Sequence, residues 1–167
     1  MLNTPFDELP ETARVWVYGA DKPLESRAEE ELLSAVDSYL TRWTAHGTPL
    51  SAARDWRECR FLTIAVDQEQ AGASGCSIDG LFRTLKTIEK SLDASIVTSG
   101  LIFFRDRSGV IQSVTREQFS ELGAAGEVDG DTEVFDLSVT SLAEWRARFS
   151  SRTAASWHAS LLPARAR

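Results

Sequence analysis

The chain has 167 residues, of which 43% are apolar and 26% charged, as in an ordinary globular protein and unlike a disordered one. Its 18 lysine and arginine residues against 25 aspartate and glutamate residues give a net charge of −7, which argues against nucleic-acid binding as the main function. No apolar run is long enough for a membrane span, residues 1–8 lack the pattern of a signal peptide, and the two cysteines form no CxxC pair. We therefore expect a cytoplasmic protein without a cofactor.

The first two predicted elements are a strand and a helix. Residues 14–18 alternate β-branched and aromatic side chains, which predicts the strand. Apolar side chains recur at helical spacing over residues 25–45, which predicts the helix. We expect the helix to end at His46 and Gly47, because glycine suits the left-handed residue after a last turn and Pro49 forbids continuation.

The next elements follow from their apolar patterns. We expect an extended segment at 50–56, a central strand at 61–66, a second helix at 77–92 and a strand at 101–104. The order strand, helix, strand, strand, helix, strand is that of an α+β ferredoxin-like βαββαβ sandwich, in which two helices cover one face of an antiparallel sheet. We expect this domain to occupy residues 1–97.

Residues 98–167 read as a small C-terminal extension. A hairpin loop is expected at 105–109, a short helix capped by Thr115, a strand at 133–136 and a last helix at 141–149. The stretch FFRDRSGVIQSVTREQFSELGAAGEVDGDTEVFD resembles the small bacterial GYF-like modules. In those modules exposed aromatic side chains receive proline-rich peptides, and the resemblance gives that role to Phe103, Phe104 and Phe135. The alternative is that this part extends the packing of the first sheet.

Four segments together carry a second resemblance: RVWVYGADKPL, WTAHGTPLSA, AGASGCSID and SWH. They resemble a family of uncharacterised bacterial proteins of about this length, whose members often bear the label "ABC transporter ATPase". An ATPase of that class needs a GxxxxGK[ST] loop, in which backbone N–H groups and a lysine hold the phosphates. The chain has no such loop, because the glycines at 72 and 75 are followed by no lysine before Lys86. The sequence therefore argues against the ATPase activity.

The segment GASGCSID, residues 72–79, combines two glycines, hydroxyls, a thiol and a carboxylate between the central strand and the second helix. A helix N-terminus favours anions and lowers the pKa of a thiol. Ser74, Gly75 and Ser77 are thus candidate anion-binding residues, and Cys76 is a candidate nucleophile. Ser74 and Ser77 also suit simple helix caps, and Cys76 also suits a small buried residue at a tight turn.

Two further residues complete a candidate catalytic set with Cys76. In the predicted layout the end of the first helix and the start of the second share one edge, which lets His46 act as a base beside Cys76. Asp79 would orient the histidine, or alternatively pair with Arg83 one turn later. His158 is a second histidine that could reach Cys76 from the tail. These residues lack the usual spacings of a metal site, so we expect none.

Two functions remain open. The first is a binding domain that uses the GASGCSID turn to recognise a partner protein or a small anionic ligand. The alternative is a small thiol-dependent hydrolase or transferase with Cys76, His46 and Asp79 as its catalytic residues. The first requires only an accessible loop, and we favour it.

Overall fold

The computed structural model describes residues 4–45, 47–69 and 75–164. The chain separates into two compact units, Met1–Thr98 with Ser138–Trp145 (unit 1) and Ser99–Leu137 with Arg146–Arg167 (unit 2). The fold is mixed α+β, and both main sheets are antiparallel. In the described residues, the elements before Ser99 are η1 (Phe6–Glu8), β1 (Arg14–Gly19), α1 (Ser26–Arg42), β2 (Thr44–Ala45), β3 (Thr48–Pro49), β4 (Ser51–Arg57), β5 (Phe61–Asp67) and α2 (Gly75–Leu92).

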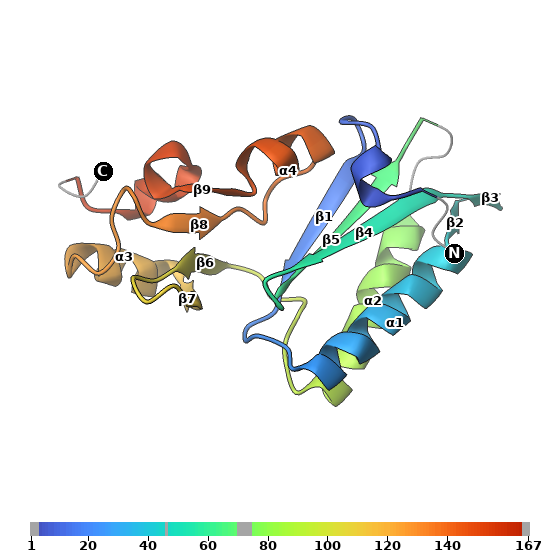
Figure 1. Ribbon diagram of the computed structural model, residues 1–167, viewed down its shortest axis with the longest axis horizontal. Coiled ribbons are helices and arrows are strands. Elements are labelled where there is room, and N and C mark those ends of the chain that lie inside the picture. The colour runs from blue at the N-terminus through green and yellow to red at the C-terminus, as the bar shows by residue number, and fades with distance from the viewer. Residues whose placement is uncertain (1–3, 46, 70–74, 165–167) are drawn as a thin grey trace. The chain divides into compact units, whose positions relative to one another are not determined.

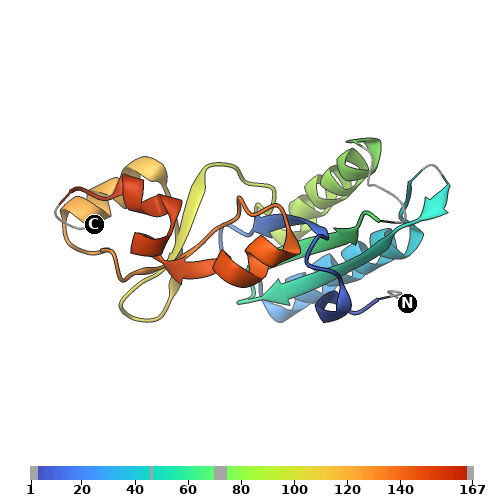
Figure 2. The ribbon, with the colours of Figure 1, turned by 90° about the horizontal axis from the view of Figure 1, so that it is seen from above.

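Unit 1 is built on a three-stranded sheet in the order β1-β5-β4 (Figure 1). Its central strand β5 is buried from Phe61 to Val66, because strands pair with both of its edges and its two faces are covered. Alternate β5 residues, among them Leu62 and Ile64, pack against α1 and α2, which lie side by side on one face of the sheet (Figure 2). Burial of each such aliphatic side chain contributes about 2 kcal/mol to the free energy of unfolding.

The helices pack through the apolar stripes predicted from the sequence. Leu32, Val36 and Leu40 of α1 and Leu81 and Leu85 of α2 are all buried. These positions recur every three or four residues, so each helix turns one apolar face to the sheet. The predicted helix at 77–92 is confirmed, with its start two residues earlier at Gly75.

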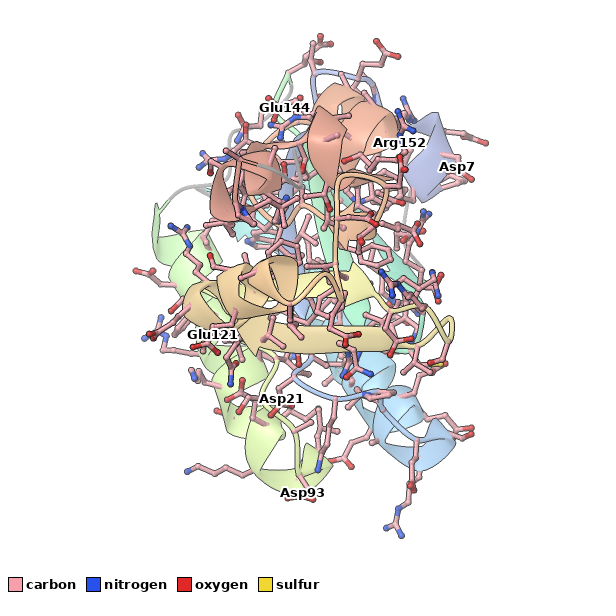
Figure 3. All side chains as sticks on the ribbon, turned by 90° about the vertical axis from the view of Figure 1, so that its left-hand side faces the viewer. Asp7, Asp21, Asp93, Glu121, Glu144 and Arg152 are labelled. Carbon is pink, nitrogen blue, oxygen red and sulfur yellow. The ribbon has the colours of Figure 1, made fainter. Side chains whose placement is uncertain are left out.

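The end of α2 is fixed by Asp93, labelled in Figure 3. Its φ of 50° is the left-handed conformation that usually requires glycine after a last helical turn. The Asp93 carboxylate accepts a hydrogen bond of 2.9 Å from Lys22 Nζ at the surface. The Lys22 ammonium group, through this hydrogen bond and its charge, lowers the pKa of the Asp93 carboxyl.

The predicted end of the first helix is wrong. Helix α1 ends at Arg42, and residues 44–45 pair with residues 48–49 as the small hairpin β2–β3. Gly47 does adopt a positive φ of 82°, but it serves the tight turn between these strands instead of a helix cap. A glycine followed closely by a proline, as at Gly47 and Pro49, occurs both at helix ends and in hairpin turns. The sequence alone therefore did not distinguish a helix end from a hairpin.

Unit 2 is a second antiparallel sheet, in the order β7-β6-β8-β9. Its elements in the described residues are β6 (Leu101–Arg105), β7 (Ile111–Thr115), α3 (Arg116–Ala124), β8 (Glu133–Phe135), the C-terminal end of α4 (Leu142–Arg148), β9 (Ser150–Arg152), η2 (Thr153–Ala155) and η3 (Trp157–Leu161). The predicted hairpin and the cap of α3 are confirmed. The Thr115 hydroxyl accepts a hydrogen bond from Gln118 N, and the Gln118 side chain accepts one from Thr115 N.

The ferredoxin-like arrangement is not confirmed, because its expected fourth strand lies elsewhere. Residues 101–105 form β6, which pairs with β7 and β8 in the sheet of unit 2. The edge of β1 that this strand would occupy instead meets Ser141, through an antiparallel bridge to Arg14. Most of the C-terminal part thus belongs to the sheet of unit 2, whereas residues 138–145 pack in unit 1.

Candidate functional site

The junction between β5 and α2 is where the sequence places the candidate site. Strand β5 ends at Asp67 and α2 begins at Gly75, so the predicted passage from central strand to helix is confirmed. Cys76 and Ser77 follow Gly75 in the first turn of α2, although their side chains lie outside the described part of the structure. His46 and Ser74 lie outside the described residues altogether, and so does the proposed Cys76–His46 pair.

The end of α1 and the start of α2 lie at the same end of the helix pair (Figure 1). At that end Tyr39 of α1 meets Gly80 of α2, and a β-carbon at Gly80 would lie 2.4 Å from the Tyr39 hydroxyl oxygen. At the other end Ser91 Oγ donates a hydrogen bond of 2.5 Å to Glu31 Oε1. The helices are therefore antiparallel, as the sequence predicted, and glycine at position 80 permits their close approach.

Three polar groups lie near the first turns of α2. Burial raises the pKa of the Tyr39 hydroxyl, while the Arg83 guanidinium and a hydrogen bond with the Leu81 backbone act in the opposite direction. Arg83 Nε donates a hydrogen bond of 3.3 Å to the main-chain oxygen of Asp79. The exposed Asp79 and Arg83 are thus neighbours, as expected, although this contact uses the backbone instead of the carboxylate.

Trp43 adds a buried donor at the end of α1. Its ring centroid lies 5.6 Å from that of Tyr39, and only 4% of the residue is exposed. Its Nε1 has no hydrogen-bond partner in the described structure, which is costly for a buried N–H group.

The chemistry that these groups support is the recognition of negative charge. The N-terminus of an 18-residue helix carries a partial positive charge, and Arg83 adds a full one. In residues 4–45, 47–69 and 75–164, no three histidine, cysteine, aspartate or glutamate side chains gather in a way that could hold a metal ion.

No family model, curated protein or solved structure matches the chain. The family resemblance drawn from its four sequence segments therefore stays a prediction.

Unit 2 holds a second polar cluster, centred on His158 and Asp136. The His158 ring stacks on Trp157 with centroids 4.0 Å apart, and the Arg116 guanidinium lies 5.1 Å from the centroid of the Trp157 ring. Trp157 Nε1 donates a hydrogen bond of 3.2 Å to Asp136 Oδ1, and Arg148 forms an ion pair with Asp136 Oδ2. Asp136 is 1% exposed, so these two donors stabilise a buried carboxylate.

His158, the second histidine that the sequence offers for Cys76, lies within unit 2. Its side chain is buried within unit 2, edge-on to Phe119, and Ser156 Oγ lies 3.0 Å from its Nδ1. The histidine is therefore part of a packed core. Desolvation lowers its pKa to about 4; the nearby Asp136 carboxylate opposes this shift and Arg116 adds to it.

No pattern in the sequence points to the Asp136 cluster. Asp136 is the last residue of a predicted strand, and Arg148 lies in a predicted helix, at no spacing typical of a motif. Asp136 N also donates a hydrogen bond of 2.7 Å to Phe149 O, so their pairing depends on how the chain returns beside β8. The local pattern around each residue describes only a turn or a polar helix face.

The aromatic side chains expected to receive a peptide are buried. Phe103, Phe104 and Phe135 are between 1% and 4% exposed, and Phe104 packs edge-on against Phe119 at 5.5 Å. The expectation that these rings form an exposed peptide surface is therefore wrong. Among the residues that the structure describes, no helix combines the length and apolar character needed to cross a bilayer.

Proposed function

We propose that the chain is a binding protein that recognises a small anionic ligand, or an anionic group on a partner protein, at the start of α2. The observation that carries the proposal is the 18-residue helix α2, which begins at Gly75 as the next element after the buried central strand that ends at Asp67. A rigid strand on one side and a packed helix on the other would hold the amides of Gly75, Cys76 and Ser77 in place for an anion.

Neighbouring groups support an anionic ligand at this end of the helix pair. Arg83 provides a positive charge two turns into α2, and the Tyr39 hydroxyl lies beside Gly80. The start of α1 differs in charge, because Glu25 occupies its N-cap and Glu29 its first turn. Carboxylates at the start of α1 would repel an anion. We therefore expect an anion to bind at the start of α2 and not at the start of α1.

The test is a titration of the ¹⁵N-labelled protein with inorganic phosphate, followed by amide chemical shifts. We expect saturable shifts at residues 75–78 and none at residues 26–28. Arg83→Gln should weaken phosphate binding several-fold, whereas Lys86→Gln, which removes the same charge one turn further along α2, should leave it nearly unchanged. Equal losses in both variants, or shifts without saturation, would contradict a defined site.

The alternative function is a thiol-dependent hydrolase or transferase with Cys76 as nucleophile, His46 as base and Asp79 as orienting group. It is supported by the place of Cys76 in the first turn of α2, where the helix dipole lowers the pKa of a thiol. Cys59 provides an internal reference, because partial desolvation and the carboxylates of Glu29 and Glu58 raise the pKa of its thiol. The pH dependence of iodoacetamide alkylation, measured in Cys59→Ala and in Cys76→Ala proteins, gives the pKa of each thiol separately. An ordinary thiol pKa for Cys76 would exclude the enzyme.

We also propose that unit 1 is a modified ferredoxin-like sandwich. Its sheet order β1-β5-β4 and the positions of α1 and α2 suit the first five elements of that fold. In that fold the last strand pairs with the first one. Here Ser141 makes the antiparallel bridge to Arg14 in that place, so residues near Ser141 would stand in for the fourth strand.

A further inference from the structure

A segment that interrupts unit 2 completes unit 1. Residues Ser138–Trp145, named here the strap, pack in unit 1, whereas the chain on either side, 99–137 and 146–167, belongs to unit 2. The strap follows β8 of unit 2 in the chain and is joined to the rest of unit 1 only through unit 2. It is therefore bound to unit 1 much as a peptide ligand would be.

The strap adds to the edge of β1 by backbone hydrogen bonds. Val15 N donates to Thr140 O at 3.0 Å, and Leu142 N donates to Ala13 O at 2.8 Å. These two bonds flank the bridge between Arg14 and Ser141. Addition of a strand to a sheet edge is a common mode of peptide recognition, in which main-chain bonds give affinity and side chains give specificity.

Two apolar anchors of the strap fix its position on unit 1. Leu142 is fully buried and Trp145 is 7% exposed. Trp145 Nε1 donates a hydrogen bond of 3.0 Å to Thr63 Oγ1 on the central strand. Its ring lies 4.3 Å from the Arg57 guanidinium and meets Phe6 edge-on at 5.0 Å. A buried tryptophan with a satisfied N–H is a typical interface hot spot.

The strap also holds its own shape. Glu144, labelled in Figure 3, accepts hydrogen bonds from Thr140 N at 2.8 Å and from Thr140 Oγ1 at 3.2 Å. Glu144 N in turn donates to Ser141 Oγ at 3.2 Å. These bonds lie within the strap, so it can keep its bound conformation on any copy of unit 1.

We propose that this face of unit 1 also takes the strap of a second copy of the chain, so that two copies exchange straps and form a closed dimer. The contacts made by the strap are the same in either case, and exchange of identical elements is a low-cost route to dimers. The chain crosses into unit 2 between Thr98 and Ser99. Gly100 follows with a φ of 79°, and a β-carbon at this position would meet no atom within 4 Å, so this connection has room to change conformation.

The test is a disulfide between two different copies of the full chain. Position 14 and position 141 form a pair flanked by the two backbone bonds, for which the Cα atoms of an antiparallel ladder are about 4.5 Å apart, within disulfide range. Arg14→Cys and Ser141→Cys are placed in separate chains that carry Cys59→Ala and Cys76→Ala, and the chains are mixed over a range of concentrations under mild oxidation. We expect a covalent heterodimer whose fraction rises with concentration.

Two controls make the result decisive. A single chain with both new cysteines must close its internal disulfide, which shows that the pair is correctly placed. A Ser141→Cys chain mixed with a chain that retains only the exposed Cys59 measures random cross-linking. If the heterodimer does not exceed that background while the internal disulfide forms, the strap does not act between copies and the proposal is overturned.

A change at the connection gives an independent readout by light scattering. Gly100→Val strains the positive φ and should raise the dimer fraction several-fold. Gly109→Val is the matched control, because Gly109 has a φ of 87° and equally open surroundings but lies in the β6–β7 hairpin. Equal dimer fractions in the two variants would contradict exchange through this connection.

Discussion

Acidification should destabilise unit 2 through a single histidine. His158 is 1% exposed, and desolvation by burial lowers its pKa from 6.5 to about 4. The unfolded chain therefore binds a proton at a higher pH than the folded one. The stabilising effect is complete above pH 6.5, is lost progressively as the pH falls toward 4, and does not change further below that value.

The size of the effect follows from the two pKa values. A depression from 6.5 to about 4 corresponds to about 3 kcal/mol of unfolding free energy, at 1.36 kcal/mol per pH unit. That is a large share of the stability of a small domain. The nearby Asp136 carboxylate limits the depression and Arg116 increases it.

The assay is urea unfolding between pH 7 and pH 4, followed by the amide resonances of unit 2. Many carboxylates titrate near the lower limit, so the informative quantity is the difference between wild type and His158→Gln. In the variant, the free energy of unfolding should lose the part of its decrease between pH 6.5 and pH 4 that His158 causes. His46→Gln, which removes the only other histidine, is the matched control for the titration of an imidazole elsewhere.

Two results would refute this reasoning. One is an NMR titration that gives His158 an ordinary pKa near 6.5, which would mean that the folded protein admits water or a counter-charge to the ring. The other is an identical pH slope in wild type and His158→Gln, which would assign the acid sensitivity to the carboxylates alone.

Three further substitutions test the packing described above. Gly80→Ala should destabilise the wild type, because the new methyl group would lie 2.4 Å from the Tyr39 hydroxyl oxygen. In a Tyr39→Phe background the same substitution should stabilise the protein by up to about 1 kcal/mol through helix propensity. Thermal unfolding of the four proteins gives the coupling energy between positions 39 and 80, and the absence of coupling would contradict the contact between Tyr39 and Gly80. Thr63→Val removes the acceptor of the Trp145 N–H and should cost about 1–3 kcal/mol in chemical denaturation, an effect that Trp145→Phe in the same background should reduce. Asp136→Asn removes the buried negative charge that pairs with Trp157 Nε1 and the Arg148 guanidinium. The substitution should lower the free energy of unfolding of unit 2 by about 2 kcal/mol, and an unchanged melting temperature would show that the ion pair is not stabilising.

The local elements were readable from the sequence because each depends on residues close together in the chain. The apolar stripe of α2, the buried run of β5 and the capping box at Thr115 are all patterns within a short stretch of sequence. The antiparallel order of the two helices also followed, since short crossovers from neighbouring strands leave few alternatives. The candidate anion site rests on the same kind of local signal.

Long-range pairing was decided only by the tertiary structure. The pattern of residues 101–105 indicates a strand with buried faces, but it does not indicate which other strand this strand pairs with. In this protein β6 pairs with β7 and β8, and the edge of β1 receives Ser141, from a part of the chain far from it in sequence. The same is true of Phe103 and His158, whose burial depends on elements contributed from far along the chain.

The sequence by itself thus determined where β1, α1, β5 and α2 lie in the chain and which faces the two helices bury. The tertiary structure decided which edges and faces meet, because an unpaired strand edge and an apolar face accept any complementary segment that the chain can deliver. Thr63 and Trp145 illustrate the difference. Neither residue's surroundings in the sequence point to the other, yet their hydrogen bond joins the central strand to the strap.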